Sequence, residues 1–254
     1  MTLQKQIVNS LANKTEELQN QGYCILKGRF ANSLVDNCRL AFLPILQTYL
    51  KHNGHLSNRG ANRHFIPMPF EPSCFSPEFF FDAEILTVAK NVMGDKIVAD
   101  QWGCDFPLLG SSYQTMHVDY QRPLFHETPN LELPFYMLVV SFGLTKITQE
   151  NGALELAPGT HRMPREEATN AVETSKINML PINMDIGDVL IRHPWTLHRG
   201  TPNNTDTPRL LVTIRYVRNW YCDRSREVNS IPTSLWKSLT HEQRNMLRFP
   251  VQIT

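Results

Sequence analysis

The chain has 254 residues and a formal net charge of +1, with 41% hydrophobic and 19% charged residues. This composition is typical of a globular protein and excludes an intrinsically disordered one. A net charge near zero creates no overall field that would attract nucleic acid or an anionic membrane, so neither partner is expected. The length suits one β-sandwich or barrel with added helices, and no linker or repeat interrupts it. We therefore expect a single domain over 1–254.

The cysteines favour a reducing environment. The chain has five cysteines, an odd number, and no C-x-x-C motif. They are widely spaced, at Cys24, Cys38, Cys74, Cys104 and Cys222. Such scattered thiols are not typical of a disulfide framework or a thiolate zinc site. The first residues have no long apolar stretch like that of a signal peptide, and no apolar run approaches the ~18 residues of a membrane-spanning helix. These features predict a cytoplasmic protein.

The first part of the chain, about 1–95, is expected to be mainly helical. The spacing of apolar residues predicts helices over 2–20, 33–52 and 83–93. Ser33 is a plausible N-cap of the second helix. A short strand is predicted over 22–26, where Gly22 marks the break after the first helix. Residues 53–80 are rich in Asn, Gly, Pro and Phe, and we expect them to be irregular.

From about residue 96 to 220 the pattern changes to short strands. Runs rich in β-branched and aromatic residues alternate with turn residues, at 96–106, 112–119, 134–146, 153–157, 179–183, 188–192, 197–199 and 209–218. Regular short strands of this kind predict an antiparallel sandwich or barrel. A capping-box pattern at Thr240 predicts one last helix, over about 233–247. The expected fold is thus mainly β with flanking helices.

His117, Asp119 and His198 form an H-x-D…H pattern. On a strand, side chains alternate between two faces, so His117 and Asp119 would point to the same side. Two imidazoles and one carboxylate are the ligands of a non-haem Fe(II) site, with open positions for a bidentate ligand and O₂. H-x-D alone is a weak motif, and a hydrogen-bonded pair without a metal is an alternative interpretation.

The context of His198 strengthens the metal interpretation. Residues 185–191 read as a Gly-Asp turn followed by a buried strand that leads to His198, and Arg209 opens the next predicted strand. We expect His198 and Arg209 to lie on paired neighbouring strands, close enough to contact one bound molecule.

These motifs, in this order, resemble the phytanoyl-CoA dioxygenase family of Fe(II)/2-oxoglutarate oxygenases. The matching segments cover most of the chain: Gly22-Tyr23, His117-Val118-Asp119, Asn151-Gly152-Ala153-Leu154, Pro158-Gly159-Thr160-His161-Arg162, Gly187-Asp188 and His198…Arg209. The resemblance is specific only when the segments are taken together. It implies a double-stranded β-helix, a cupin-like jelly roll.

The resemblance also implies the roles of the site residues. His117, Asp119 and His198 would hold Fe(II), and Arg209 would pair with the distal carboxylate of 2-oxoglutarate. An iron(II) ion, Asp119 and the 2-oxoglutarate dianion sum to one negative charge, which Arg209 would neutralise. Gln101, on the strand before H-x-D, would also contact 2-oxoglutarate. Family members often have a hydroxyl two residues after the second histidine, where this chain has Gly200.

Two loop-like segments are candidate walls of the substrate pocket, 57–70 and 120–135. Their cationic and aromatic residues suggest a polar or anionic small molecule; they are Arg59, Arg63, His64, Arg122, Phe125 and His126. His193 and His161 are expected to be structural, and Asp105 is a possible pocket residue.

The resemblance implies that the protein hydroxylates, or otherwise oxidises, an unactivated C–H bond of a small molecule. We expect the substrate to be a secondary-metabolite intermediate, with O₂ consumed and succinate and CO₂ released. The carboxylate at Asp119 argues against halogenation, because related halogenases have a small residue there. Two alternatives use the same ligands or fold: a metal-dependent hydrolase, and a non-catalytic jelly-roll protein that binds a small molecule.

Overall fold

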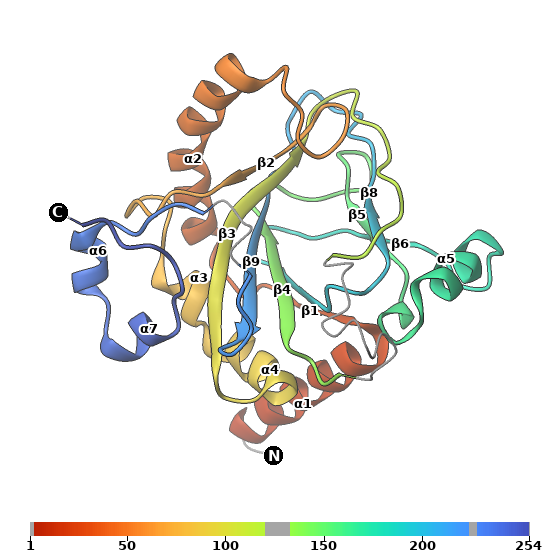
Figure 1. Ribbon diagram of the computed structural model, residues 1–254, viewed down its shortest axis with the longest axis horizontal. Coiled ribbons are helices and arrows are strands. Elements are labelled where there is room, and N and C mark those ends of the chain that lie inside the picture. Colours follow the sequence, from red (N-terminus) through yellow and green to blue (C-terminus); the bar gives the residue numbers. More distant parts are fainter. Residues whose placement is uncertain (1–2, 120–132, 224–227, 254) are drawn as a thin grey trace.

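Two antiparallel β-sheets form the centre of the computed structural model, which describes residues 3–119, 133–223 and 228–253 (Figure 1). The larger sheet has the strand order β1-β7-β4-β9-β3-β2, and the smaller sheet has the order β6-β5-β8. The larger sheet contains β1 (Tyr23–Leu26), β2 (Arg63–Pro67), β3 (Ile97–Pro107), β4 (Met137–Gly143), β7 (Val189–Arg192) and β9 (Leu211–Arg218). The smaller contains β5 (Leu154–Leu156), β6 (Leu180–Ile182) and β8 (His198–Gly200). This architecture is mainly β with flanking helices, as expected.

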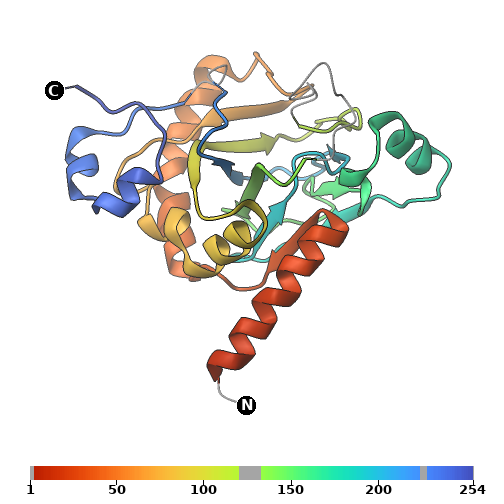
Figure 2. The same ribbon diagram turned by 60° about the horizontal axis from the view of Figure 1, so that its bottom comes forward.

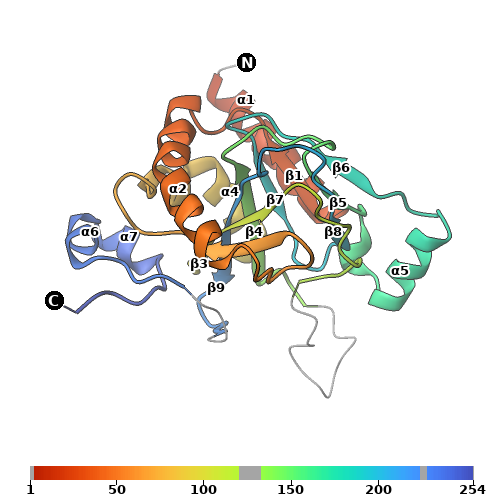
Figure 3. The same cartoon turned by 90° about the horizontal axis from the view of Figure 1, so that it is seen from above.

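Helices cover the outer face of the larger sheet. The helices are α1 (Leu3–Gln21), α2 (Asn32–Asn53), α3 (Pro77–Phe81), α4 (Ala83–Met93), α5 (Arg165–Glu173), α6 (Thr233–Ser238) and α7 (His241–Asn245). Helices α2 and α4 lie on one side of the larger sheet, whereas α5 and the smaller sheet lie on the other (Figure 3). Helix α1 contacts β1 and α4 (Figure 2). Within the described residues, no helix combines the length and the hydropathy needed to cross a membrane.

The strands of the larger sheet have two different faces. On β3, Trp102, Cys104 and Phe106 are buried in the core against the helices, whereas Gln101 and Asp105 line a cavity on the other face. This follows from the two-residue period of a strand. The same alternation on the neighbouring strands turns a second set of residues to the cavity: Val139, Ser141, Arg192, Leu211 and Thr213.

An aromatic cluster joins the helices to the larger sheet. Phe142 of β4 stacks on Phe79 of α3 with ring centroids 4.7 Å apart, and it contacts Phe30 edge-on at 5.1 Å. Phe142, Phe79 and Phe30 are all buried. The cluster therefore fixes the face of the sheet opposite the cavity.

The N-terminal part differs from the predictions in two places, whereas the short strand predicted over 22–26 is confirmed as β1, which pairs with β7. Residues 53–80 are not wholly irregular, since they contain β2 and α3. The prediction of Ser33 as a helix cap was wrong: α2 begins at Asn32, and its N-cap is Ala31 with no side-chain hydrogen bond.

Two later predictions were also wrong. The expected strand over 112–119 is only an isolated bridge between His117 and His198. The expected single helix over 233–247 is two short helices, α6 and α7. The predicted capping box does open α7, with Thr240 and Gln243 exchanging hydrogen bonds. The break falls just before it, because the backbone at Leu239 and Thr240 is extended.

Replacing Phe142 with alanine should destabilise the protein by about 3–5 kcal/mol, because it removes a fully buried ring and leaves a cavity. Urea unfolding followed by circular dichroism measures this change. Leu40→Ala is the control, since Leu40 is 58% exposed and its loss should change the free energy of unfolding by less than about 0.5 kcal/mol. Equal effects of the two substitutions would contradict the assignment of Phe142 to the core.

Candidate metal centre

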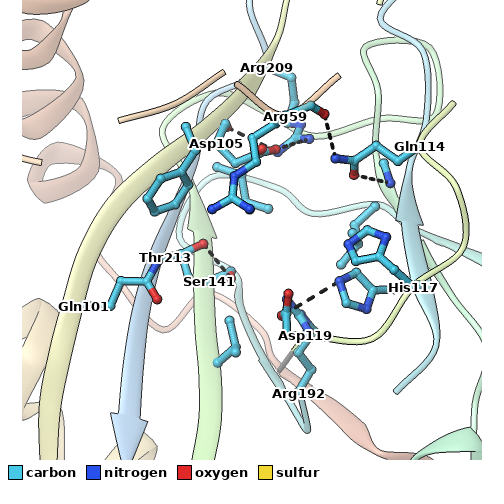
Figure 4. Close-up of a pocket in the computed structure, with 16 residues that line it drawn as sticks. Arg59, Gln101, Asp105, Gln114, His117, Asp119, Ser141, Arg192, Arg209 and Thr213 are labelled. Carbon is cyan, nitrogen blue, oxygen red and sulfur yellow. Dashed lines mark hydrogen bonds and ion pairs between the residues drawn. The ribbon is translucent and has the colours of Figure 1, made fainter. Parts of the chain in front are cut away.

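A cavity of about 110 Å³ lies between the two sheets (Figure 4). Both sheets, the segment before β4 and the segment before β2 contribute to its walls. The lining residues are Arg59, Phe65, Gln101, Asp105, Gln114, His117, Asp119, Val139, Ser141, Leu154, Arg192, His198, Gly200, Arg209, Leu211 and Thr213. All five residues expected at the site, including Gln101 and Arg209, therefore line one cavity.

The two histidines are held by a backbone bridge. The N–H of His117 donates to the carbonyl of His198 at 2.9 Å, and the N–H of His198 donates back to His117 at 2.9 Å. Their rings lie close together as a result, with centroids 4.4 Å apart. The bridge attaches the H-x-D segment to β8 of the smaller sheet, although this segment forms no strand of its own.

Both imidazoles are oriented in the same way. Nδ1 of His117 is 2.8 Å from the carbonyl of Thr115, and Nδ1 of His198 is 2.8 Å from the carbonyl of Thr196. A carbonyl oxygen can only accept, so each Nδ1 carries the proton in a neutral ring. Each Nε2 then keeps its lone pair for a metal, which is the usual second contact of a metal-binding histidine.

Asp119 completes a three-residue group. One ligand atom from each of His117, Asp119 and His198 lies within 4.8 Å of the others. The N–H of Asp119 donates to the carbonyl of Pro194 at 2.9 Å, which holds the segment against the β7–β8 connection. Two imidazole nitrogens and one carboxylate match the 2-His-1-carboxylate ligand set.

Burial and nearby charges together keep Asp119 and His198 in the protonation states that a metal needs. Burial opposes ionisation of Asp119, but Arg192 and the two histidines outweigh it, so the pKa of this carboxyl is well below its usual range. Burial and Arg192 lower the pKa of His198 to about 3. Asp119 is therefore ionised and His198 neutral near pH 7.

Arg209 lies at the other end of the cavity and is 1% exposed. Its Nε donates to the carbonyl of Gly152 at 3.1 Å, and its Nη2 donates to Oδ2 of Asp105 at 3.0 Å. Nη1 also donates to the carbonyl of Asp105 at 3.4 Å. A guanidinium has five N–H donors, so these contacts leave two for another acceptor.

The expected pairing of the strands that carry His198 and Arg209 was wrong. His198 begins β8, which pairs with β5 of the smaller sheet, and Arg209 precedes β9 of the larger sheet. The segment between them crosses from one sheet to the other. The two side chains consequently line the cavity from different sheets.

Gly200 is required by a buried arginine. A Cβ at this position would lie 2.5 Å from Nη1 of Arg63 and 2.7 Å from Oε1 of Gln114. Arg63 is 1% exposed, donates to the carbonyl of Thr201 and lies 3.6 Å from Asp105. Arg63 therefore occupies the space beside Gly200, where the resemblance noted from the sequence implies a hydroxyl.

The predicted pocket walls are only partly reproduced. Arg59 lines the cavity, with its guanidinium 5.0 Å from the ring centroid of Phe65. Arg63 and His64 are not among its lining residues. Both are buried outside it, and His64 stacks on Phe106. The other three predicted residues, Arg122, Phe125 and His126, lie outside the described residues.

Among the cavity residues that the sequence interpretation missed, Gln114 and Arg192 form hydrogen bonds within the site. Arg192 follows Leu190 on the same face of β7, so strand alternation could have placed it toward the cavity. Gln114 accepts a hydrogen bond from the N–H of Gly200 at 2.9 Å, a contact that no sequence pattern indicates.

A family model described as phytanoyl-CoA dioxygenase matches residues 18–211. The chain belongs to the phytanoyl-CoA dioxygenase family. The dioxygenase lolE1 of Epichloe uncinata is 27% identical over 177 residues, which cover 62% of this chain and 63% of that protein. The iron/alpha-ketoglutarate-dependent dioxygenase ausO of Aspergillus calidoustus is 28% identical over 110 residues, covering 41% of this chain and 36% of that protein. The matches thus span less than two thirds of these relatives.

Solved structures share the fold of this phytanoyl-CoA dioxygenase family member. The epimerase SnoN, in complex with Fe3+, alpha ketoglutarate and nogalamycin RO, has a TM-score of 0.64 at 16% identity and covers 97% of this chain and 96% of its own. HygX from Streptomyces hygroscopicus, with nickel and 2-oxoglutarate bound, has a TM-score of 0.61 at 15% identity, with coverages of 88% and 92%. The predicted double-stranded β-helix is confirmed.

Substituting His198 with alanine should weaken binding of Fe(II) at least about tenfold, because one of three nitrogen and oxygen donors is lost. Anaerobic calorimetric titration with Fe(II) measures the dissociation constant. His55→Ala is the matched control, since His55 is exposed and lies outside the cavity. Equal affinity of the two variants would contradict the metal assignment.

Two buried histidines near the β7–β8 connection should make stability fall in acid. Burial lowers the pKa of His161 to about 4, and burial and His161 lower that of His193 to about 3. Nδ1 of His193 accepts from the N–H of Trp195, and Nε2 of His161 contacts the carbonyl of Gln19. The unfolded chain therefore takes up protons first as the pH falls below about 6.5, which favours unfolding.

Urea unfolding between about pH 7 and about pH 5 measures this effect, with a slope of up to ~1.4 kcal/mol per pH unit for each histidine. His161→Gln keeps a donor for Gln19 but cannot titrate, so it should flatten the slope. The exposed His52→Gln should leave the slope as in the wild type. A slope unchanged by His161→Gln would count against this assignment.

Proposed function

We propose that this protein is an Fe(II)/2-oxoglutarate-dependent dioxygenase that oxidises an unactivated C–H bond of a small molecule. One observation carries the proposal: a group of two histidines and one carboxylate shares a cavity with a buried arginine that has two N–H donors left. The group fits a divalent metal. The arginine fits a carboxylate, which it can bind in a bidentate, charge-assisted manner.

Each residue then has a defined role. His117, Asp119 and His198 hold the iron, and Arg209 binds the distal carboxylate of 2-oxoglutarate from the opposite end of the cavity. Gln101 faces the cavity from β3, across from His117 (Figure 4), where it would contact the co-substrate. Iron and 2-oxoglutarate, when bound, supply the oxidation of a C–H bond by O₂ with release of succinate and CO₂. Asp119 keeps a carboxylate among the ligands, which favours oxygenation over halogenation.

The walls between the two ends determine how the co-substrate lies. Apolar side chains of Val139, Leu154 and Leu211 are among those that line the cavity, while Ser141 and Thr213 contact each other through their hydroxyls at 3.3 Å. Apolar walls reduce the access of water to the reacting atoms. The protein's part is therefore to position the ligands and to exclude water.

The proposed substrate is a polar or anionic secondary-metabolite intermediate. Arg59 is exposed at the cavity and is held against Phe65, so it can meet an acidic group of an incoming molecule. The structural neighbours support this class, since SnoN and the carbocyclase SnoK are both described as enzymes of nogalamycin biosynthesis. We propose that the whole chain forms one oxygenase domain around this cavity.

A hydrolase with the same ligands would need a general base near the metal. Among the cavity-lining residues of the described segments, the one carboxylate besides Asp119 is Asp105. Asp105 is held by Arg209 at 3.0 Å and by Arg63 at 3.6 Å. It is therefore poorly placed to take up a proton from a metal-bound water.

Adding Fe(II) and 2-oxoglutarate without oxygen should produce a visible metal-to-ligand charge-transfer band. His117→Ala should abolish the band, because a metal ligand is lost. Arg209→Ala should weaken 2-oxoglutarate binding roughly ten- to hundredfold, since a charge-assisted hydrogen-bonded pair is lost. Absorption titrations measure both effects, and Arg29→Ala, far from the cavity, should match the wild type.

Succinate production with O₂ against a panel of small molecules then narrows the substrate. A wild-type protein that shows no band, and that binds zinc in preference to iron, would overturn the oxygenase proposal in favour of a hydrolase. Binding of a small molecule without any succinate formation would favour a non-catalytic binding protein.

A further inference from the structure

Arg192 is the last residue of β7 and enters the cavity next to the metal ligands. Its strand pairs with β1 and β4, placing Arg192 opposite Tyr23 and Val139. Strand alternation puts it on the cavity face with Leu190, whereas Ile191 packs in the helix-side core. Its position is thus set by the sheet and not by a loop.

One terminal nitrogen of the Arg192 guanidinium is hydrogen-bonded to Asp119, a proposed metal ligand. Nη2 of Arg192 lies 2.6 Å from Oδ2 of Asp119, and the same oxygen is 3.9 Å from Nε2 of His198 (Figure 4). The contact is a short, charge-assisted hydrogen bond. It fixes the orientation of the Asp119 carboxylate before any metal binds.

The other terminal nitrogen of Arg192, Nη1, has no hydrogen-bond acceptor among the described residues. Arg192 is 8% exposed, and its Nη1 is buried without a hydrogen-bond partner. A buried, unsatisfied N–H group of a cation is unfavourable, and a ligand that supplies an acceptor there removes this cost. Because the guanidinium is planar and rigid, its contact with Asp119 also fixes where Nη1 points.

The charges of the cavity leave room for an anion at this place. Three buried arginines in or beside the cavity, Arg63, Arg192 and Arg209, face two carboxylates, Asp105 and Asp119. With a divalent metal bound, these groups sum to three positive charges (3 − 2 + 2). This positive balance favours an anionic group beside Arg192 despite the nearby charge of Asp119.

We propose that Arg192 is a second anion anchor, whose Nη1 binds the carboxylate of the 2-oxo acid unit of the co-substrate while Nη2 holds Asp119. This inference rests on the proposed function. Arg209 and Arg192 then hold the two carboxylates of 2-oxoglutarate at opposite ends of the cavity. The 2-oxo acid end is recognised by a cation as well as by the metal.

Binding of two 2-oxo acids, 2-oxoglutarate and pyruvate, distinguishes the contribution of Arg192 from that of Arg209. Pyruvate has the 2-oxo acid unit of 2-oxoglutarate but no distal carboxylate. Anaerobic absorption titrations of the Fe(II) protein with each acid give two dissociation constants. Arg192→Met should raise both by a similar factor, roughly ten- to hundredfold. Arg209→Met should raise the constant for 2-oxoglutarate and leave that for pyruvate unchanged.

Three controls keep the result specific. Calorimetric titration with Fe(II) alone checks that Arg192→Met retains the metal. Arg192→Lys keeps the charge but loses the planar pair of donors, so its constants should lie between those of the wild type and Arg192→Met. Arg29→Met removes an arginine that pairs with Asp82 at 2.7 Å, and it should change neither constant.

Unchanged constants for both acids in Arg192→Met would overturn the inference, and the anion beside Arg192 would then have to come from the substrate. Loss of Fe(II) binding in both Arg192 variants would overturn it as well, because Arg192 would then act only by positioning Asp119. A wild-type protein without the charge-transfer band would instead be a failure of the proposed function itself.

Discussion

Pairing of charges inside the cavity is the constraint on which the site depends. Arg63, Arg209 and Arg192 are each at least nine-tenths buried, and an isolated buried charge is very costly. Each therefore forms an ion pair with a carboxylate: Arg63 and Arg209 pair with Asp105, and Arg192 pairs with Asp119. Removing either aspartate leaves at least one guanidinium without its counter-ion, so these carboxylates hold the site together as well as taking part in it.

This pairing changes the charge count that the sequence suggested. Iron, Asp119, 2-oxoglutarate and Arg209 alone sum to zero, which made Arg209 the residue that neutralises the site. With Asp105 beside Arg209, the charge of that arginine is already offset, and Arg63 and Arg192 enter the count. The cavity with both ligands keeps an excess positive charge. It therefore remains suited to a further anionic group after the co-substrate has bound.

The sequence predicted the parts of the fold that depend on local patterns. Seven of the eight runs expected between 96 and 218 overlap a strand of the structure, and β3 was predicted within one residue at each end. These predictions succeeded because the two-residue alternation of a strand is a property of the local sequence. It could not predict β2, whose strand state depends on pairing with β3. Nor did it predict α5, a short helix with only Ala168 and Ala171 buried and hence a weak apolar period.

For the candidate site too, the sequence predicted what depends on local patterns and not what depends on tertiary structure. Residue types and order identified His117, Asp119, His198 and Arg209, but not how the backbone brings them together. The reciprocal hydrogen bonds of His117 and His198 join two segments separated by most of the jelly roll, and the chain crosses between sheets before Arg209. Both are tertiary events, to which local propensity contributes little.

Arg192 shows why a pattern can be present and still be missed. Within Val189–Arg192 every residue is buried, so the strand reads as an apolar run that happens to end in a charge. A terminal arginine is ordinarily free to extend into water with its charged end. Here the H-x-D segment lies across the end of β7, because the N–H of Asp119 donates to the carbonyl of Pro194. The Asp119 carboxylate then covers the guanidinium of Arg192. The contact that encloses Arg192 is thus also the one that orients Asp119, a proposed metal ligand.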